Sequence, residues 1–185
     1  QAERLAHHAL RGELWEKAVA YLRQAGLRAM ARAANREAVA HLEQALGALR
    51  RLPETRETTE LTIDIHIDLR SALDPLGEWA RIGEHLHEAE VLARTLGDQH
   101  RLGRIATFMV DQCVFTGDYD EAVRFGQEAL SIARTLGDRS IEVVATSFLG
   151  ITHVARGEFS DAATLFERNV ALEGDLRYER FGAPA

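Results

Sequence analysis

The chain is poor in the residue types that cross-link or interrupt a fold. It has one cysteine and three prolines in 185 residues, and aromatic residues make up only 6% of it. A single cysteine excludes an intrachain disulfide, which fits a reducing compartment, so we expect a cytoplasmic protein. Few prolines together with abundant alanine and leucine favour helices, because proline breaks a helix interior.

Long apolar runs and an excess of positive charge are also lacking. No run approaches the roughly 18 apolar residues that a membrane helix needs, so we expect no membrane partner. The chain carries 22 Lys and Arg against 29 Asp and Glu, a net charge of −7. The basic residues alternate with acids rather than forming one stripe, so nucleic acid is not an expected partner either.

What the chain does have is an internal repeat. Ala93-Arg94-Thr95-Leu96-Gly97-Asp98 returns unchanged at residues 133–138, a period of 133 − 93 = 40 residues. Glycines at 77, 117 and 157 keep the same spacing, and an acid and then an aromatic residue follow each. A fixed period of this size is typical of stacked helical hairpins.

The glycine and aspartate of the repeat predict where helices end and begin. Gly97 and Gly137 fit a left-handed residue just after a helix, and Asp98 and Asp138 fit the N-cap of the next helix. Asn35 is expected to cap a helix in the same way. The apolar spacing then predicts helices at about 2–11, 13–32, 36–49, 78–95, 99–115, 118–136, 139–156 and 158–173, with residues 54–60 as a linker and then the start of a further helix.

One segment gives conflicting signals. Residues 61–69 alternate apolar and polar, as a half-buried strand does. A lone strand in a helical array would leave its backbone groups without partners, so we expect a helix here.

The predicted fold is all-α: a right-handed α-α superhelix, or solenoid, of about nine antiparallel helices. We expect irregular repeat helices over 1–53, regular repeats of about 40 residues over 54–173 and a tail over 174–185. Helical periodicity begins at once and stops without a polar capping helix, so we expect a piece of a longer protein.

The repeat units resemble the tetratricopeptide repeat, a helix-turn-helix unit with small and large residues at fixed places. Gly117, Tyr119 and Ala122 match its pattern, as do Gly157, Phe159 and Ala162, whereas Ile82 and Gly126 depart from it. The resemblance implies that the first helix of each pair lines a concave, partner-binding surface. Its register places there Asp64, Ile67, Ser71, Arg104, Thr107, Asp111, Phe115, Val144, Ser147, Ile151 and Val154.

A narrower resemblance concerns the runs Trp15–Leu22, Ala33–Ala38 and Leu61–Leu69. These are similar to the repeat array that follows the ATPase domain in bacterial adenylate or guanylate cyclases and in ATPase-type transcriptional regulators. The resemblance implies a region that senses a partner or gates upstream domains. No phosphate-binding loop is present in this chain, so no such catalytic activity is expected in it.

The residues with reactive side chains do not form a predicted site. His85 and His87 are two apart on a helix and point in different directions, so a solvated face is expected there. Cys113 is expected to be a buried small hydrophobe, His153 a packed histidine bonded to a backbone carbonyl, and the aromatic residues Trp15, Trp79, Tyr119 and Phe159 packing residues. We therefore expect no catalytic residues, no metal site and no cofactor.

Two functions remain open at this point. The first is a non-catalytic region for protein–protein interaction or regulation, whose partner is a protein, a peptide or a neighbouring domain of the same polypeptide. The alternative is a structural module that mediates self-association.

Overall fold

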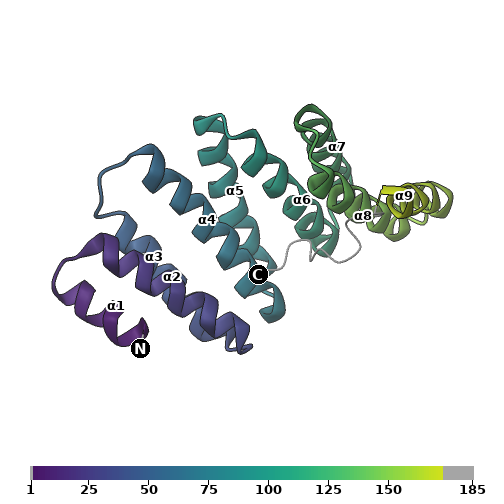
Figure 1. Ribbon diagram of the computed structural model, residues 1–185. Coiled ribbons are helices and arrows are strands. Elements are labelled where there is room, and N and C mark those ends of the chain that lie inside the picture. Colours follow the sequence, from purple (N-terminus) through teal and green to yellow (C-terminus); the bar gives the residue numbers. More distant parts are fainter. Residues whose placement is uncertain (1, 173–185) are drawn as a thin grey trace. The chain divides into compact units, whose positions relative to one another are not determined.

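The computed structural model describes residues 2–172, and no strand occurs among them. Helices follow one another along the chain, joined by short turns (Figure 1). The all-α prediction is confirmed. The elements are α1 (Ala2–Arg11), α2 (Trp15–Ala31), α3 (Asn35–Leu49), α4 (Arg56–Leu73), the short 3-10 helix η1 (Asp74–Leu76), α5 (Trp79–Leu96), α6 (Gln99–Thr116), α7 (Tyr119–Leu136), α8 (Arg139–Ala155) and α9 (Phe159–Leu172).

The predicted helix boundaries at the repeated motif are confirmed. Gly97 and Gly137 have φ of +67°, a left-handed conformation that a side chain would strain. The carboxylate of Asp98 accepts the amide N–H of Arg101, and Asp138 accepts that of Ile141 at 3.0 Å. Each motif therefore ends one helix and begins the next.

Asn35 does not cap a helix. Ala34 occupies the N-cap position of α3 and offers no side-chain hydrogen bond, while Asn35 is the first helical residue. The prediction was wrong by one position because two adjacent alanines give no local sign of where the turn closes. α4 begins with a cap that we did not predict. The side chains of Thr55 and Thr58 each accept a hydrogen bond from the other residue's backbone N–H, which forms a capping box.

The alternating segment Leu61–Leu69 lies inside α4, as expected. Ile63, Ile65 and Leu69 are fully buried, so this helix is covered on most of its sides rather than on one face. Asp64 and Asp68 are four residues apart and so lie on one helix face. Both face Arg23 of α2, whose Nε donates to Asp68 Oδ2 at 2.7 Å.

Two compact units divide the chain, and the division falls within α5: one unit runs to Leu92 and the other begins at Ala93. In the first unit, α2 packs on α1 and α3, and α3 on α4, around buried residues such as Leu22 and Leu42. In the second unit, α7 packs on α6 and α8, α8 on α9, and α6 on α8. Its core includes Ala129, Ala145 and Leu149.

Close helix crossings in both units depend on glycine. A Cβ on Gly126 of α7 would lie 2.4 Å from the Leu149 side chain of α8, and one on Gly26 would lie 2.8 Å from Leu42. Gly126 departs from the repeat pattern at a position that normally carries a large residue. The structure gives the physical reason, since Leu149 occupies the space that a side chain at residue 126 would need.

Residues 174–185, for which a tail was predicted, lie outside the described part of the chain. Among the helices that the structure does describe, none combines the length and apolar character that crossing a membrane requires.

Candidate functional site

The predicted partner-binding residues of the second unit lie on α6 and α8, which pack side by side. Phe115 is 59% exposed and Ile151 45%, and Val154 is almost equally exposed. Arg104 is exposed as well, and Asp111 and Val144 are half-buried. We call these six residues the α6–α8 surface. Exposed large apolar side chains on neighbouring helices are the kind of group that a partner covers.

Other predicted residues are already engaged inside the protein. Ile67 and Thr107 are buried, with 6% and 3% of their surface exposed. Thr107 donates its hydroxyl to the Arg104 carbonyl oxygen at 2.7 Å. Their positions in the repeat predicted that both residues lie on the concave surface. In the structure, other parts of the protein cover them. We therefore leave them out of the partner-binding surface.

Three more of the predicted residues have intramolecular partners. Asp64 lies 3.9 Å from Arg23 Nη1. Ser71 donates to the Ile67 carbonyl oxygen, and Ser147 accepts a hydrogen bond of 2.6 Å from the Asn169 side chain. The contacts of Asp64 and Ser147 join two helices, and that of Ser71 lies within α4, so we do not count these three among the six residues of the α6–α8 surface.

The first unit contains an open cavity of about 350 Å³ that the sequence analysis did not foresee. It lies where α3, the 50–54 loop, α4 and α5 meet. Its polar lining includes Arg50, Glu54, His66 and Glu88, and leucines supply the apolar part: Leu46, Leu49, Leu52 and Leu92. This size and mixed lining are typical of sites that hold a small amphipathic molecule.

A buried and a half-buried histidine form a hydrogen-bonded pair beside this cavity. His66 of α4 is 2% exposed, and its Nδ1 lies 3.1 Å from Nδ1 of His85 on α5. Its Nε2 lies 3.2 Å from Glu88 Oε2. A neutral His66 satisfies both contacts if His85 donates to it and it donates to the Glu88 carboxylate.

Burial sets the protonation of this pair. Burial, together with the nearby charges of His85 and Arg50, lowers the pKa of His66 to about 4. Burial also lowers the pKa of His85, although Glu88 opposes the shift. The expectation of a solvated face at His85 was wrong, because spacing along one helix does not show that His66 of another helix lies against it.

Cys113 is buried, as predicted. Burial, together with the negative charges of Asp118 and Glu121, raises the pKa of its thiol to about 11. At neutral pH the group is therefore a protonated thiol, which is a poor nucleophile.

His153 does not bond a backbone carbonyl as predicted. Its Nδ1 lies 2.6 Å from Glu158 Oε2, at the turn between α8 and α9. Among the four recurring aromatics, Trp15, Trp79 and Tyr119 are partly buried, but Phe159 is 68% exposed. The expectation that Phe159 is a packing residue was wrong.

Comparisons with known proteins support the helical-repeat fold. The tetratricopeptide repeat family model matches residues 103–172, which lie in the second unit. No curated protein sequence matches the chain. The crystal structure of BtubC (BKLC) from P. vanneervenii is similar, with a TM-score of 0.79 and 17% identity over 99% of this chain and 76% of that one.

The chain has a tetratricopeptide-like helical repeat fold. Aspartyl phosphate phosphatase F from Bacillus subtilis shows the same likeness, with a TM-score of 0.75 and 11% identity over 94% of this chain and 50% of that one. So does a Rap protein complexed with competence and sporulation factor, with a TM-score of 0.75 and 12% identity over 86% and 44%. At these identities the likeness shows the fold alone, and it confirms the predicted helical-repeat class.

Proposed function

We propose that this helical repeat region is a non-catalytic binding region for a protein or peptide, and that the partner binds the α6–α8 surface. The observation that carries the proposal is the exposure of Phe115, Ile151 and Val154 on two helices that pack side by side. Repeat folds of this kind present extended surfaces for recognition.

The composition of the surface suits a peptide that carries apolar side chains. Completing the burial of Phe115 and Ile151 is worth up to about 1.5–3 kcal/mol for each side chain. Arg104 and Asp111 add charges of both signs, which orient a partner more than they strengthen its binding. An amphipathic peptide segment is therefore the expected occupant, since it combines apolar anchors with polar groups at the rim.

We further propose that the region works within a bacterial signalling protein, where occupancy of the surface biases neighbouring domains. Two observations support this context. The runs Trp15–Leu22 and Leu61–Leu69 resemble repeat arrays of ATPase-associated cyclases and transcriptional regulators. One of the similar structures is a Rap protein bound to competence and sporulation factor. The mechanism would be a shift between conformations that differ in affinity for the partner.

A selection from a phage-displayed library of random peptides, with the full chain as bait, tests the binding proposal. We expect enriched peptides with two or more apolar anchors. The double variant Phe115→Ala/Ile151→Ala should lose at least about tenfold in affinity for them, since truncated anchors at a binding hot spot cost more than about 1.4 kcal/mol.

Val170→Ala is the matched control, because Val170 is an exposed apolar residue of α9 outside the surface. It should bind the peptides as the unchanged chain does. Equal binding by the double variant would contradict the proposal. Sedimentation of the same proteins distinguishes the self-association alternative: a dimer that the double variant abolishes would show that a second copy, not a peptide, covers the surface.

A further inference from the structure

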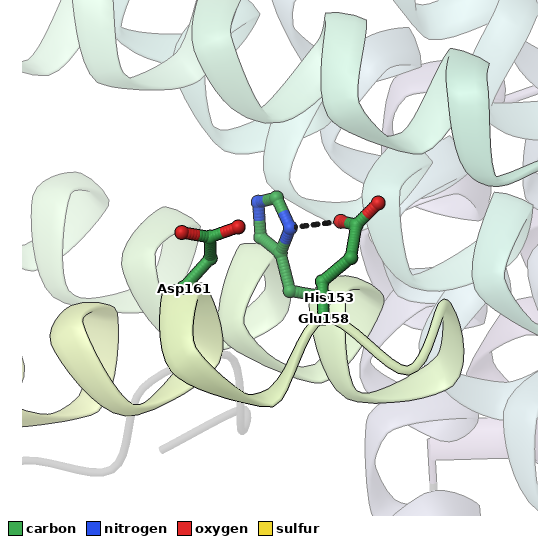
Figure 2. Close-up of side chains that lie close together, drawn as sticks. All are labelled: His153, Glu158 and Asp161. Carbon is green, nitrogen blue, oxygen red and sulfur yellow. Dashed lines mark hydrogen bonds and ion pairs between the residues drawn. The ribbon is translucent and has the colours of Figure 1, made fainter.

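Three side chains that are typical metal ligands converge at the turn between α8 and α9. His153 lies in the last turn of α8, Glu158 immediately precedes α9, and Asp161 lies in the first turn of α9. Each offers one ligand atom, and these atoms all lie within 4.8 Å of one another. Figure 2 shows the imidazole ring between the two carboxylates.

Two hydrogen bonds hold the Glu158 carboxylate of this group. One oxygen of Glu158 lies 2.6 Å from His153 Nδ1, and the other accepts a hydrogen bond of 2.8 Å from Arg156 Nε. These bonds lower the pKa of Glu158, so its carboxylate is charged at neutral pH. The imidazole therefore lies next to two acidic groups, one of which Arg156 holds in place.

The preceding repeat provides an internal comparison at positions 40 residues earlier. Cys113, Asp118 and Glu121 occupy the corresponding places. There the Glu121 carboxylate pairs with Arg124 at 2.6 Å. Thr164 stands where Arg124 would be in the last repeat, so Asp161 has no arginine at the equivalent position. The last repeat therefore differs from its neighbour by having a histidine and by lacking this arginine.

We propose that His153, Glu158 and Asp161 together bind a divalent zinc ion. An imidazole nitrogen and carboxylate oxygens are zinc ligands, with metal–ligand distances of about 2.0–2.2 Å. A tetrahedral ion at these distances holds its ligand atoms about 3.4 Å apart. Nδ1 of His153 and Oε2 of Glu158 must separate slightly, while Asp161, which is exposed, must move closer. Both changes require rotation of the side chains.

The proposed ion has three protein ligands, which leaves its fourth position to water. The zinc ion takes the place of the proton shared by His153 and Glu158, and this proton is released to the solvent. Because its ligands come from α8 and from the start of α9, the ion fixes the turn between them. It therefore stabilises the last hairpin of the described chain.

Isothermal titration of the full chain with zinc chloride at pH 7.5 tests the proposal. The titration uses a His7→Ala/His8→Ala background, which removes the adjacent histidines of α1 as competing ligands. We expect one zinc ion per chain. His153→Ala should weaken binding by about tenfold or more, because the loss of even an outer-shell partner of a metal ligand costs that much.

His100→Ala is the matched control, since His100 also contacts a carboxylate, that of Asp138, and is not one of the three proposed ligands. It should leave zinc affinity unchanged. Asp161→Asn changes an exposed side chain without altering its size and should also weaken binding, which keeps the test informative if His153→Ala fails to fold. Cobalt(II) serves as a second probe, with visible absorption bands of four-coordinate cobalt expected.

No zinc binding in the His7→Ala/His8→Ala background would overturn the proposal. Equal zinc affinity in that background with and without Asp161→Asn would overturn it as well, because the ion would then be bound elsewhere.

Discussion

At the scale of single residues, His66 is the most unusual group of the first unit. It is a histidine with 2% of its surface exposed, in a helix whose other buried side chains are mostly apolar. Its two ring nitrogens face His85 and Glu88, both of which belong to α5. Burial favours the neutral form of this imidazole, because a charged ring would lose the hydration that it has in water.

The lowered pKa of His66 predicts that the protein loses stability in mild acid. His66 takes up a proton at its ordinary pKa of 6.5 in the unfolded chain, but only at about 4 in the folded protein. The unfolded state therefore binds more protons between these values, so the free energy of unfolding falls as the pH decreases from about 6.5 toward 4. His85, whose pKa is also lowered, adds to the same trend.

Urea denaturation at several pH values between 7.5 and 5 measures this dependence. His66→Gln should flatten it, since glutamine can donate to Glu88 without titrating in this range. His87→Ala is the control, because His87 is exposed and should not alter the slope. An unchanged slope in His66→Gln would show that other groups cause the acid sensitivity.

The sequence allowed some residues to be predicted and not others, for a common reason. Gly97 and Asp98 act on the backbone next to them, so their roles could be read locally. His85 and His153 depend on partners in other elements, His66 and Glu158 respectively. For the group His153, Glu158 and Asp161, the only sign in the sequence was the spacing of these three residues. That spacing also fits an ordinary helix start with acidic residues.

At the scale of the helices, small residues allow two helices to approach each other closely. Gly126 and Leu149 illustrate this, since the Leu149 side chain lies against the bare backbone of α7. The alternating segment of α4 shows a different effect. Its charged positions, Asp64 and Asp68, both face Arg23, so the alternation reflects an ion pair between helices rather than the pleat of a strand.

The surroundings of two helical glycines, Gly126 of α7 and Gly47 of α3, predict opposite effects for their substitution by alanine. Gly126→Ala should destabilise the protein by up to about 2 kcal/mol, because overpacking costs about 1–3 kcal/mol and the gain in helix propensity is about 1 kcal/mol. Gly47→Ala should instead stabilise it by about 0.5–1 kcal/mol, since nothing lies within 4 Å of the added Cβ.

Thermal and urea unfolding of the two variants provide the measurement. Both substitutions add one methyl group within a helix, so they share the same change in propensity and differ in their surroundings. A stabilising Gly126→Ala would show that α7 and α8 do not approach as closely as described.

At the scale of the whole chain, the repeat explains why the fold class could be predicted, whereas the exposure of the residues assigned to the binding surface could be predicted only in part. The 40-residue period and the apolar spacing determine which helices form and which follow each other as hairpins. The period does not determine which side chains a neighbouring helix covers. Ile67 and Thr107 share a register position with Ser147, yet the first two are buried and the third is not.

The proposed function depends on the α6–α8 surface, whose large apolar residues Phe115, Ile151 and Val154 are exposed in the structure. Phe115 and Ile151 combine large apolar area with exposure of 59% and 45%. Apolar area of this kind contributes affinity only when a partner removes it from water.

The most direct test of the central claim is a two-dimensional amide NMR spectrum of the labelled chain, recorded while a peptide selected on it is added. The account predicts that the largest shift changes fall on residues of α6 and α8, around Phe115, Ile151 and Val154. Shift changes concentrated elsewhere, such as on the cavity residues Arg50 and His66, with α6 and α8 unaffected, would contradict it.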